Sequence, residues 1–126
     1  MRFDKVIPTD SLKPYIKYLA ISENTTESSY KVFPSAGLVI GFQYRGQLTA
    51  IKNDRDTNLT RAGITGISDS FKIFKNSINT ASILVYFTEI GLAYFTSIPA
   101  NELFNQSISL ETIFDKDKVS ETEEKL

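Results

Sequence analysis

The residue types on which most protein chemistry depends are missing from this chain of 126 residues. It contains no histidine and no cysteine, so neither a Ser-His-Asp triad nor a thiolate nucleophile can form from its side chains. Zinc sites and most catalytic iron sites also use these two residue types. Carboxylate, lysine or tyrosine chemistry remains, or binding without catalysis. We expect the last of these, with no catalytic residue, no metal and no cofactor.

Four residues are candidates for contacting a small molecule. Tyr44 and Tyr86 each offer a ring and a hydroxyl on a predicted strand, and Arg61 offers a cation that could meet an anion. Glu89 follows an apolar run, where it could point into a pocket as the partner of a cationic ligand. The competing interpretation is structural, because strand aromatics mostly pack in a core and a carboxylate at a bend favours a helix start.

Two other patterns have ordinary explanations. Asp54 and Asp56 flank an arginine in a polar loop, and two carboxylates fall well short of the oxygen ligands that calcium needs. Gly63 and Gly66 are spaced as Gly-x-x-Gly, but neither a Lys-Ser/Thr pair nor a helix start follows them. These glycines are predicted to mark strand irregularities or close backbone contacts.

The candidate residues must be positioned mainly by β-structure, since nine Phe and six Tyr favour pleated sheets. The clearest strand is predicted over 38–44, where alternate residues share an apolar face. A turn at Arg45-Gly46 is expected to return residues 47–52 as its hairpin partner. The run 81–87 has apolar groups on both faces and is predicted to be a central strand. Further strands are predicted over 17–22, 30–33, 59–68 and 71–74.

After the apolar run, the hydrophobic spacing becomes helical. Pro99 is predicted to open one helical turn and Ser109 to cap another. The sequence from Ser120 to Glu123 matches a capping box, which predicts a helix start there. Six to seven short strands followed by short helices predict a mainly β (α+β) domain, a barrel or sandwich, over 1–114. Residues 115–126, with five acidic and three basic side chains, form a charged terminal segment.

Charge and hydropathy restrict the partners. The net charge is −1 and the cations are scattered, whereas a nucleic-acid-binding domain usually carries a basic face. The first eight residues contain no apolar signal core, and no run approaches transmembrane length. We therefore expect a cytoplasmic chain with no membrane partner.

The order and spacing of several segments resemble a known family. They are Leu12-Lys-Pro-Tyr-Ile16, Phe33-Pro-Ser-Ala-Gly37, Gly63-Ile-Thr-Gly66 and Phe87-x-x-x-Gly91-x-x-x-Phe95-x-x-x-Pro99-x-x-Glu-Leu-x-Asn105. Together they resemble the N-terminal domain of a group of bacterial AraC-type transcription regulators, from about Leu12 to Phe114. The last segment is the most specific. The chain departs from the family at Glu89, where the family often has proline.

The resemblance implies a cupin-like β-barrel that binds a small-molecule effector, forms a homodimer, or both. DNA would be contacted only by paired helix-turn-helix motifs in a C-terminal half that lies outside this chain, with 115–126 as the start of the connector. The family supplies no ligand residues to carry over. Two alternatives stand beside this one. The first is a stand-alone ligand-binding barrel or barrel enzyme that uses carboxylate and tyrosine chemistry, with Glu89 in a polar cavity. The second is a purely structural dimerisation domain with a filled interior.

Overall fold

Ten strands and four short helical segments make up the described part of the chain. The structure is a computed structural model, and it describes residues 2–32, 38–52, 55–66, 69, 71–88, 91–95, 100–103, 107–112 and 114–124. The strands form two antiparallel sheets. The prediction of a mainly β fold with short C-terminal helices is confirmed, and a sandwich describes it well.

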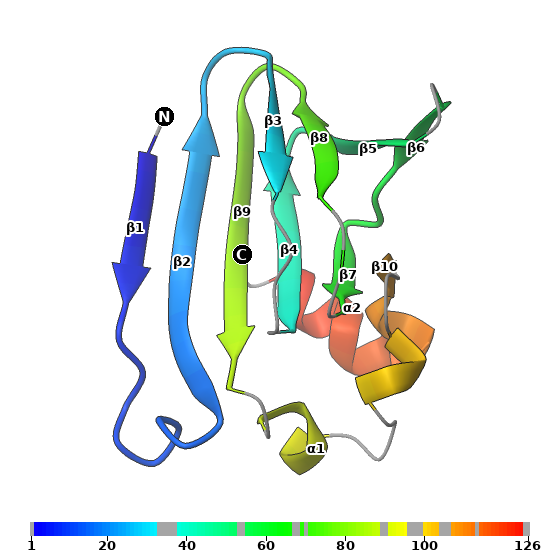
Figure 1. Ribbon diagram of the computed structural model, residues 1–126. Helices are drawn as coiled ribbons and strands as arrows, with labels where there is room; N and C mark the ends of the chain where they lie inside the picture. Colours follow the sequence, from blue (N-terminus) through cyan, green and yellow to red (C-terminus); the bar gives the residue numbers. More distant parts are fainter. Residues whose placement is uncertain are drawn as a thin grey trace.

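The larger sheet contains six strands in the order β1-β2-β9-β4-β7-β10 (Figure 1). Their bounds are β1 (Arg2–Val6), β2 (Ile16–Asn24), β9 (Thr80–Phe87), β4 (Val39–Arg45), β7 (Ala62–Thr65) and β10 (Ser107–Ser109). β9 lies between β2 and β4, which confirms the central position predicted from its apolar run. β1 and β10 are the two edge strands.

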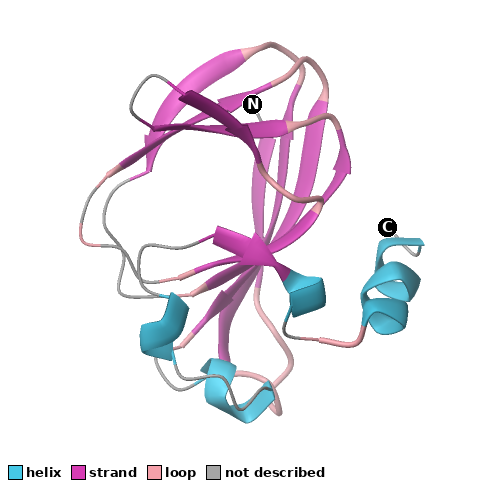
Figure 2. Ribbon diagram, turned by 90° about the vertical axis from the view of Figure 1, so that its right-hand side faces the viewer, coloured by secondary structure: helices cyan, strands magenta, loops and turns pink. Residues whose placement is uncertain are grey.

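The smaller sheet has the order β3-β8-β5-β6. Its strands are β3 (Ser28–Val32), β8 (Lys72–Asn76), β5 (Leu48–Lys52) and β6 (Arg55–Asn58). The helical segments are α1 (Gly91–Phe95), η1 (Ala100–Leu103), η2 (Leu110–Thr112) and α2 (Lys116–Glu124). Figure 2 shows the smaller sheet folded over one side of the larger sheet and α2 on the other side.

The chain after Arg45 crosses into the smaller sheet and does not run back along β4. β5 pairs with β6 and β8, so the predicted hairpin between 38–44 and 47–52 is wrong. Gly46 does form a turn, with a φ of 77° that suits glycine. The Gln43 side chain supports the crossover, because its Oε1 accepts the Leu48 N–H at 2.9 Å and its Nε2 donates to the Thr60 carbonyl at 3.0 Å.

The C-terminal helix also begins elsewhere than the sequence pattern suggested. α2 starts at Lys116, so the predicted helix start at Ser120 is wrong. Asp115 supplies the cap, because its Oδ1 accepts the Asp117 N–H at 2.8 Å. The cap predicted at Ser109 is confirmed, since its Oγ accepts the Glu111 N–H at 3.3 Å at the start of η2.

The core joins one face of the larger sheet to the C-terminal segments. Ile40 and Ile64 are opposite each other in the β4–β7 register, and both are buried. Leu103 of η1, Leu110 of η2 and Val119 of α2 belong to the same cluster. Full burial of each such side chain stabilises the fold by about 1.5–3 kcal/mol. The helical segments are therefore integral to the domain.

The block with the family resemblance packs around Tyr15. Tyr94 stacks on the Tyr15 ring at a centroid distance of 4.0 Å, and Phe95 meets the same ring edge-on at 6.2 Å. The Thr88 N–H donates to the Tyr15 carbonyl at 2.9 Å. Gly91 lies so close that an added Cβ would overlap this same carbonyl oxygen. The spacing in the block thus serves to dock α1 onto the turn before β2.

Candidate functional site

The four residues singled out from the sequence do not form one site. Glu89 lies outside the described residues. Tyr44 and Tyr86 lie on neighbouring strands, but their side chains occupy opposite faces of the sheet. The Tyr44 hydroxyl bonds Glu23, and Glu23 is opposite Ala81 of β9, so Tyr44 lies on the same face as Ala81. Tyr86 is an odd number of residues from Ala81 along β9. Because side chains alternate between faces along a strand, Tyr86 points away from Tyr44.

Tyr86 forms an aromatic pair on its own face. Its ring stacks on Tyr18, directly opposite in β2, at a centroid distance of 4.4 Å. The Lys5 ammonium lies 4.6 Å from the centre of the Tyr18 ring, in a cation–π arrangement. Both tyrosines are half-buried. This arrangement suits the packing role that was the alternative to ligand contact.

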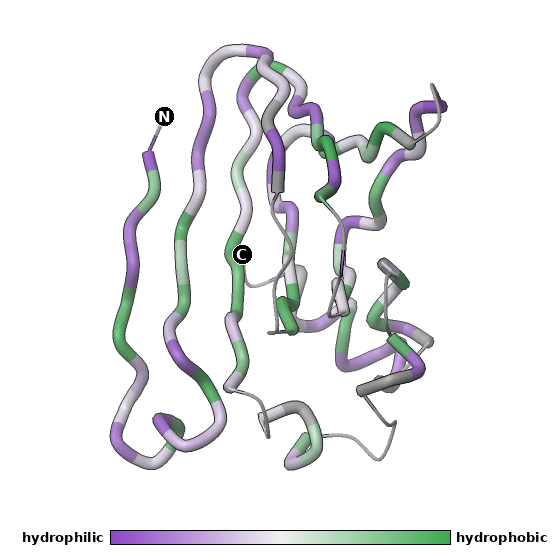
Figure 3. The backbone as a smooth tube through the Cα atoms, viewed as in Figure 1, coloured by the Kyte–Doolittle hydropathy of each residue, from purple (hydrophilic) through white to green (hydrophobic). Residues whose placement is uncertain are grey.

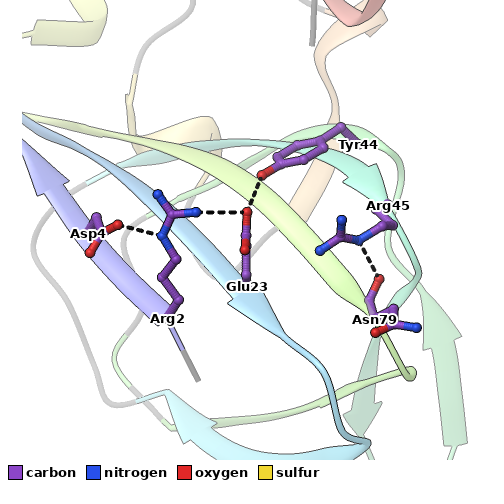
Figure 4. Close-up of polar contacts among 6 residues, drawn as sticks. All are labelled: Arg2, Asp4, Glu23, Tyr44, Arg45 and Asn79. Atoms are coloured by element: carbon purple, nitrogen blue, oxygen red, sulfur yellow. Dashed lines mark hydrogen bonds and ion pairs between the residues drawn. The ribbon is translucent and has the colours of Figure 1, made fainter.

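Tyr44 ends a row of polar side chains that crosses the larger sheet, which we call the edge network: Arg2, Asp4, Glu23 and Tyr44 (Figure 4). Arg2 Nε contacts Asp4 Oδ2 at 2.6 Å, and Arg2 Nη1 contacts Glu23 Oε1 at 3.3 Å. The Tyr44 hydroxyl donates to the same Glu23 oxygen at 3.2 Å. Ala81 is opposite Glu23 in β9, and its small side chain leaves room for Tyr44 to reach across. The network therefore ties β4 to the edge strand β1.

The electrostatics of the edge network favour a structural hydroxyl. Burial, followed by the hydrogen bond to Glu23, raises the pKa of Tyr44 above its ordinary value. The hydrogen bond to Asp4 raises the pKa of the Arg2 guanidinium. A tyrosine that acts as a base or nucleophile needs a lowered pKa. Tyr44 thus remains a protonated hydrogen-bond donor.

Arg61 lies in a surface cleft of about 330 Å³ beside β7, β10 and η2. The cleft is open to solvent and mostly polar, unlike the enclosed, mainly apolar pockets that hold most small ligands. The lining residues define what we call the Arg61 cleft: Thr60, Arg61, Ala62, Ser109 and Glu111. β7 and β10 come together here, with Gly63 opposite Ser109 in the register. A basic residue, two hydroxyl residues and an acidic residue therefore line one small space.

Two hydrogen bonds position residues that line the cleft. Arg61 Nε donates to the Gln43 carbonyl at 3.4 Å, which anchors an otherwise exposed side chain. The Thr60 hydroxyl donates to the Ala62 carbonyl at 3.1 Å. This donor and acceptor set suits a polar ligand, with an anionic group at Arg61 and a hydroxyl or amine at Glu111. The sequence identified Arg61, but it assigned Ser109 only a capping role and did not single out Glu111.

No group of three or more carboxylates that could hold a metal ion occurs among the residues that the structure describes. None of the helices in the same part of the chain is long and apolar enough to cross a membrane.

Comparisons with known proteins give a family for the chain. A family model described as a domain of unknown function (DUF6597) matches residues 4–109, which is 106 of 126 residues. The putative iron–sulfur cluster insertion protein ErpA of Ralstonia nicotianae is 30% identical over 86 residues, which cover 61% of this chain and 69% of that protein. No solved structure gives a significant match. Because the family model covers most of its length, the chain belongs to the DUF6597 family of domains of unknown function.

Proposed function

We propose that this chain is the N-terminal regulatory domain of an AraC-type transcription regulator, which acts by effector binding, dimerisation or both. The proposal rests on the overlap of two stretches of the sequence, the one that the family model matches and the one that resembles AraC-type N-terminal domains. The family match spans 4–109, and the spacing that resembles AraC-type N-terminal domains spans about 12–114. The family is in general associated with such N-terminal domains. DNA would be bound by a helix-turn-helix half outside this chain.

The Arg61 cleft is the proposed effector site, since it has a route to the C-terminal helix. Ser109 and Glu111 line the cleft on either side of Leu110, whose side chain is only 2% exposed. The Phe114 N–H donates to the Leu110 carbonyl at 2.8 Å, and Val119 of α2 packs in the same core. A ligand that draws Ser109 or Glu111 toward Arg61 would therefore displace η2 and α2 together.

A ligand screen with matched variants tests this site. At a hundredfold excess over the Kd, a small polar acid should stabilise the wild-type chain by about 2.7 kcal/mol. This stabilisation would appear as a rise in Tm. Arg61→Ala should abolish the shift. Arg55→Ala, which removes an exposed arginine on β6, should leave it unchanged. Ligands that stabilise Arg61→Ala as well as the wild type would exclude this cleft, and a library without hits would argue against an effector of this class.

DNA binding provides a second test. The chain alone should bind random duplex DNA weakly at physiological salt, because its net charge of −1 does not favour phosphate contacts. Tight binding in a gel-shift assay would contradict the assignment of DNA recognition to another part of the protein.

The other functions have less support. The ErpA relative is named for iron–sulfur cluster insertion, but clusters are held by cysteine thiolates and this chain has no cysteine. A stand-alone barrel enzyme would depend on Glu89 and a readily ionised tyrosine. Glu89 lies outside the described residues, and the raised pKa of Tyr44 does not favour proton abstraction by its phenolate.

A further inference from the structure

β1 has one edge without a strand partner in the described part of the chain. It pairs only with β2 and ends the larger sheet (Figure 1). Every residue of β1 is exposed. Its sequence, Arg-Phe-Asp-Lys-Val, mixes charged residues of both signs with two apolar residues, and Figure 3 shows hydrophilic and hydrophobic segments along it. It therefore lacks the uniformly charged surface that often protects an edge. Such an edge is ready to pair with another strand.

Exposed apolar side chains gather at this edge. Phe3 is 39% exposed, Val6 is 48% exposed and the adjacent Ile7 is 67% exposed. These are three of the seven large hydrophobic side chains that are exposed in the described residues. Because side chains alternate along a strand, Phe3 and Val6 lie on opposite faces of the sheet, each beside the free edge of β1.

The main-chain groups available for pairing belong to Phe3 and Lys5. Along an antiparallel strand, successive residues direct their N–H and C=O groups alternately to the two sides. The Phe87 N–H donates to the Leu38 carbonyl at 3.0 Å, which directs the groups of Phe87 toward β4. When this alternation is followed through the β9–β2 and β2–β1 registers, the main-chain N–H and C=O groups of Asp4 point toward β2. Phe3 and Lys5 therefore direct theirs to the free edge.

We propose that two copies of this chain pair antiparallel along β1, about a two-fold axis at Phe3, to form one continuous sheet. The inference rests on the dimerisation part of the proposed function and identifies its surface. In this register Arg2 lies opposite Asp4 of the second copy, and Asp4 lies opposite Arg2 of the second copy. Phe3 lies opposite Phe3 of the second copy, and these two residues exchange main-chain hydrogen bonds.

The charges of β1 favour this pairing register over the registers centred on the neighbouring residues. Opposite residues in a sheet share a face, so the two-fold axis must pass at a residue and not between two residues. An axis at Asp4 would place Asp4 opposite Asp4, and an axis at Lys5 would place Lys5 opposite Lys5. Like charges directly opposite each other are destabilising, whereas opposite charges and aromatic pairs stabilise. The Phe3 register gives two opposite-charge pairs and one aromatic pair.

The charged side chains of β1 are already arranged to permit close approach. Arg2 and Asp4 lie side by side on one face, 2.6 Å apart, so their charges balance before a second copy arrives. Lys5 leans over the Tyr18 ring on the other face. Glu23 and Tyr44 extend the edge network into the sheet behind the interface. The two copies would therefore bring together alternating charges.

The cysteine-free chain allows a register-specific cross-linking test. Opposite residues that exchange hydrogen bonds have Cα atoms about 5.5 Å apart, and this separation permits a disulfide. Phe3→Cys should therefore form a covalent dimer under mild oxidation. Asp4→Cys and Lys5→Cys should react far less, because the register offsets both pairs along the strand. Preferential cross-linking of Asp4→Cys or Lys5→Cys would overturn the proposed register, and no cross-linking by any of the three would overturn the β1 interface.

Charge reversal gives an independent test by sedimentation. Arg2→Glu and Asp4→Lys should each weaken self-association at least tenfold, since each opposes like charges across the interface. An equimolar mixture of the two variants should restore association as a heterodimer. Phe71→Lys, at a residue that is 53% exposed and outside β1, is the matched control and should leave association unchanged. Association that is unchanged in the single variants, or lost in the control, would overturn the inference.

The two proposals fail in different ways. A folded monomer that still responds to ligands through Arg61 would refute the β1 interface and leave the regulatory function standing. A β1-linked dimer whose native protein has no DNA-binding half would refute the regulatory function and leave the β1 interface standing. Circular dichroism of each variant checks that these substitutions, at exposed positions of β1, leave the fold intact.

Discussion

Gly91→Ala is the substitution that tests most sharply how the family-specific block works. An added Cβ at this position would overlap the carbonyl oxygen of Tyr15. Backbone atoms, unlike a flexible side chain, cannot rotate away. The turn before β2 or the start of α1 must therefore shift, and the Thr88 N–H bond to the Tyr15 carbonyl lengthens with it.

The expected loss follows from the contacts that this shift disturbs. Overpacking of a tight site costs about 1–3 kcal/mol. Weakening the Thr88 hydrogen bond costs a further ~1 kcal/mol, and weakening the Tyr15–Tyr94 stack costs about 0.5–1.5 kcal/mol. Alanine offsets at most ~1 kcal/mol through its better helix propensity. We predict a net loss of about 1.5–4.5 kcal/mol, or roughly 6–17 °C in Tm for a domain of this size.

Thermal and denaturant unfolding of Gly91→Ala and Gly41→Ala would measure the difference. At Gly41 the added Cβ would meet only the flexible Leu84 side chain, at 3.3 Å, so that variant should lose less than about 1 kcal/mol. Equal stability of Gly91→Ala and the wild type would refute the close approach of α1 to Tyr15, and with it the physical explanation proposed for the spacing from Phe87 to Phe95.

Three further predictions follow from single contacts. Tyr44→Phe should cost about 1 kcal/mol at neutral pH. The folded state raises the pKa of Tyr44, so the stability that its hydroxyl contributes is present below the ordinary pKa near 10 and is lost as the pH rises through the raised pKa. In urea titrations the variant should therefore lose less stability than the wild type at alkaline pH. Asn76→Ala should lower the free energy of unfolding by about 3 kcal/mol, because this fully buried amide bonds Ser28 and two carbonyls. An unchanged midpoint of chemical denaturation would contradict that role. Leu110→Ala should cost about 2–5 kcal/mol and speed amide exchange across α2, whereas unchanged α2 protection would show that the helix is anchored without η2.

Local patterns in the sequence predicted the parts of the fold that depend on local physics. The apolar alternation over 38–44 and the two-sided apolar run over 81–87 each became a strand, and the second is central. Ser109 caps a helical turn because its side chain competes for a nearby N–H, a relation that spans two residues. These signals need no knowledge of distant segments.

Features that depend on distant partners were predicted wrongly or not at all. The strand over 47–52 was predicted, but its pairing with β6 and β8 was not, and neither was the contact of Gln43 with Leu48 and Thr60 at the sheet crossover. β1 has a mixed charged and apolar sequence without an obvious strand signal, and it forms a strand through its register with β2.

The candidate site shows the same division. Arg61 was recognisable as a cation on a predicted strand, but its cleft also requires Ser109 and Glu111 from the far end of the domain. Tyr44 was recognisable as an aromatic hydroxyl, but its partner Glu23 lies across β9. Side-chain type is visible in a sequence, whereas convergence of side chains depends on the sheet order.

The central claim is that this chain is the regulatory half of a DNA-binding regulator. Sequencing the native gene beyond codon 126 tests it most directly. We predict an open frame that continues for about a hundred codons and encodes two helix-turn-helix motifs. A stop codon at or shortly after codon 126 would contradict the claim.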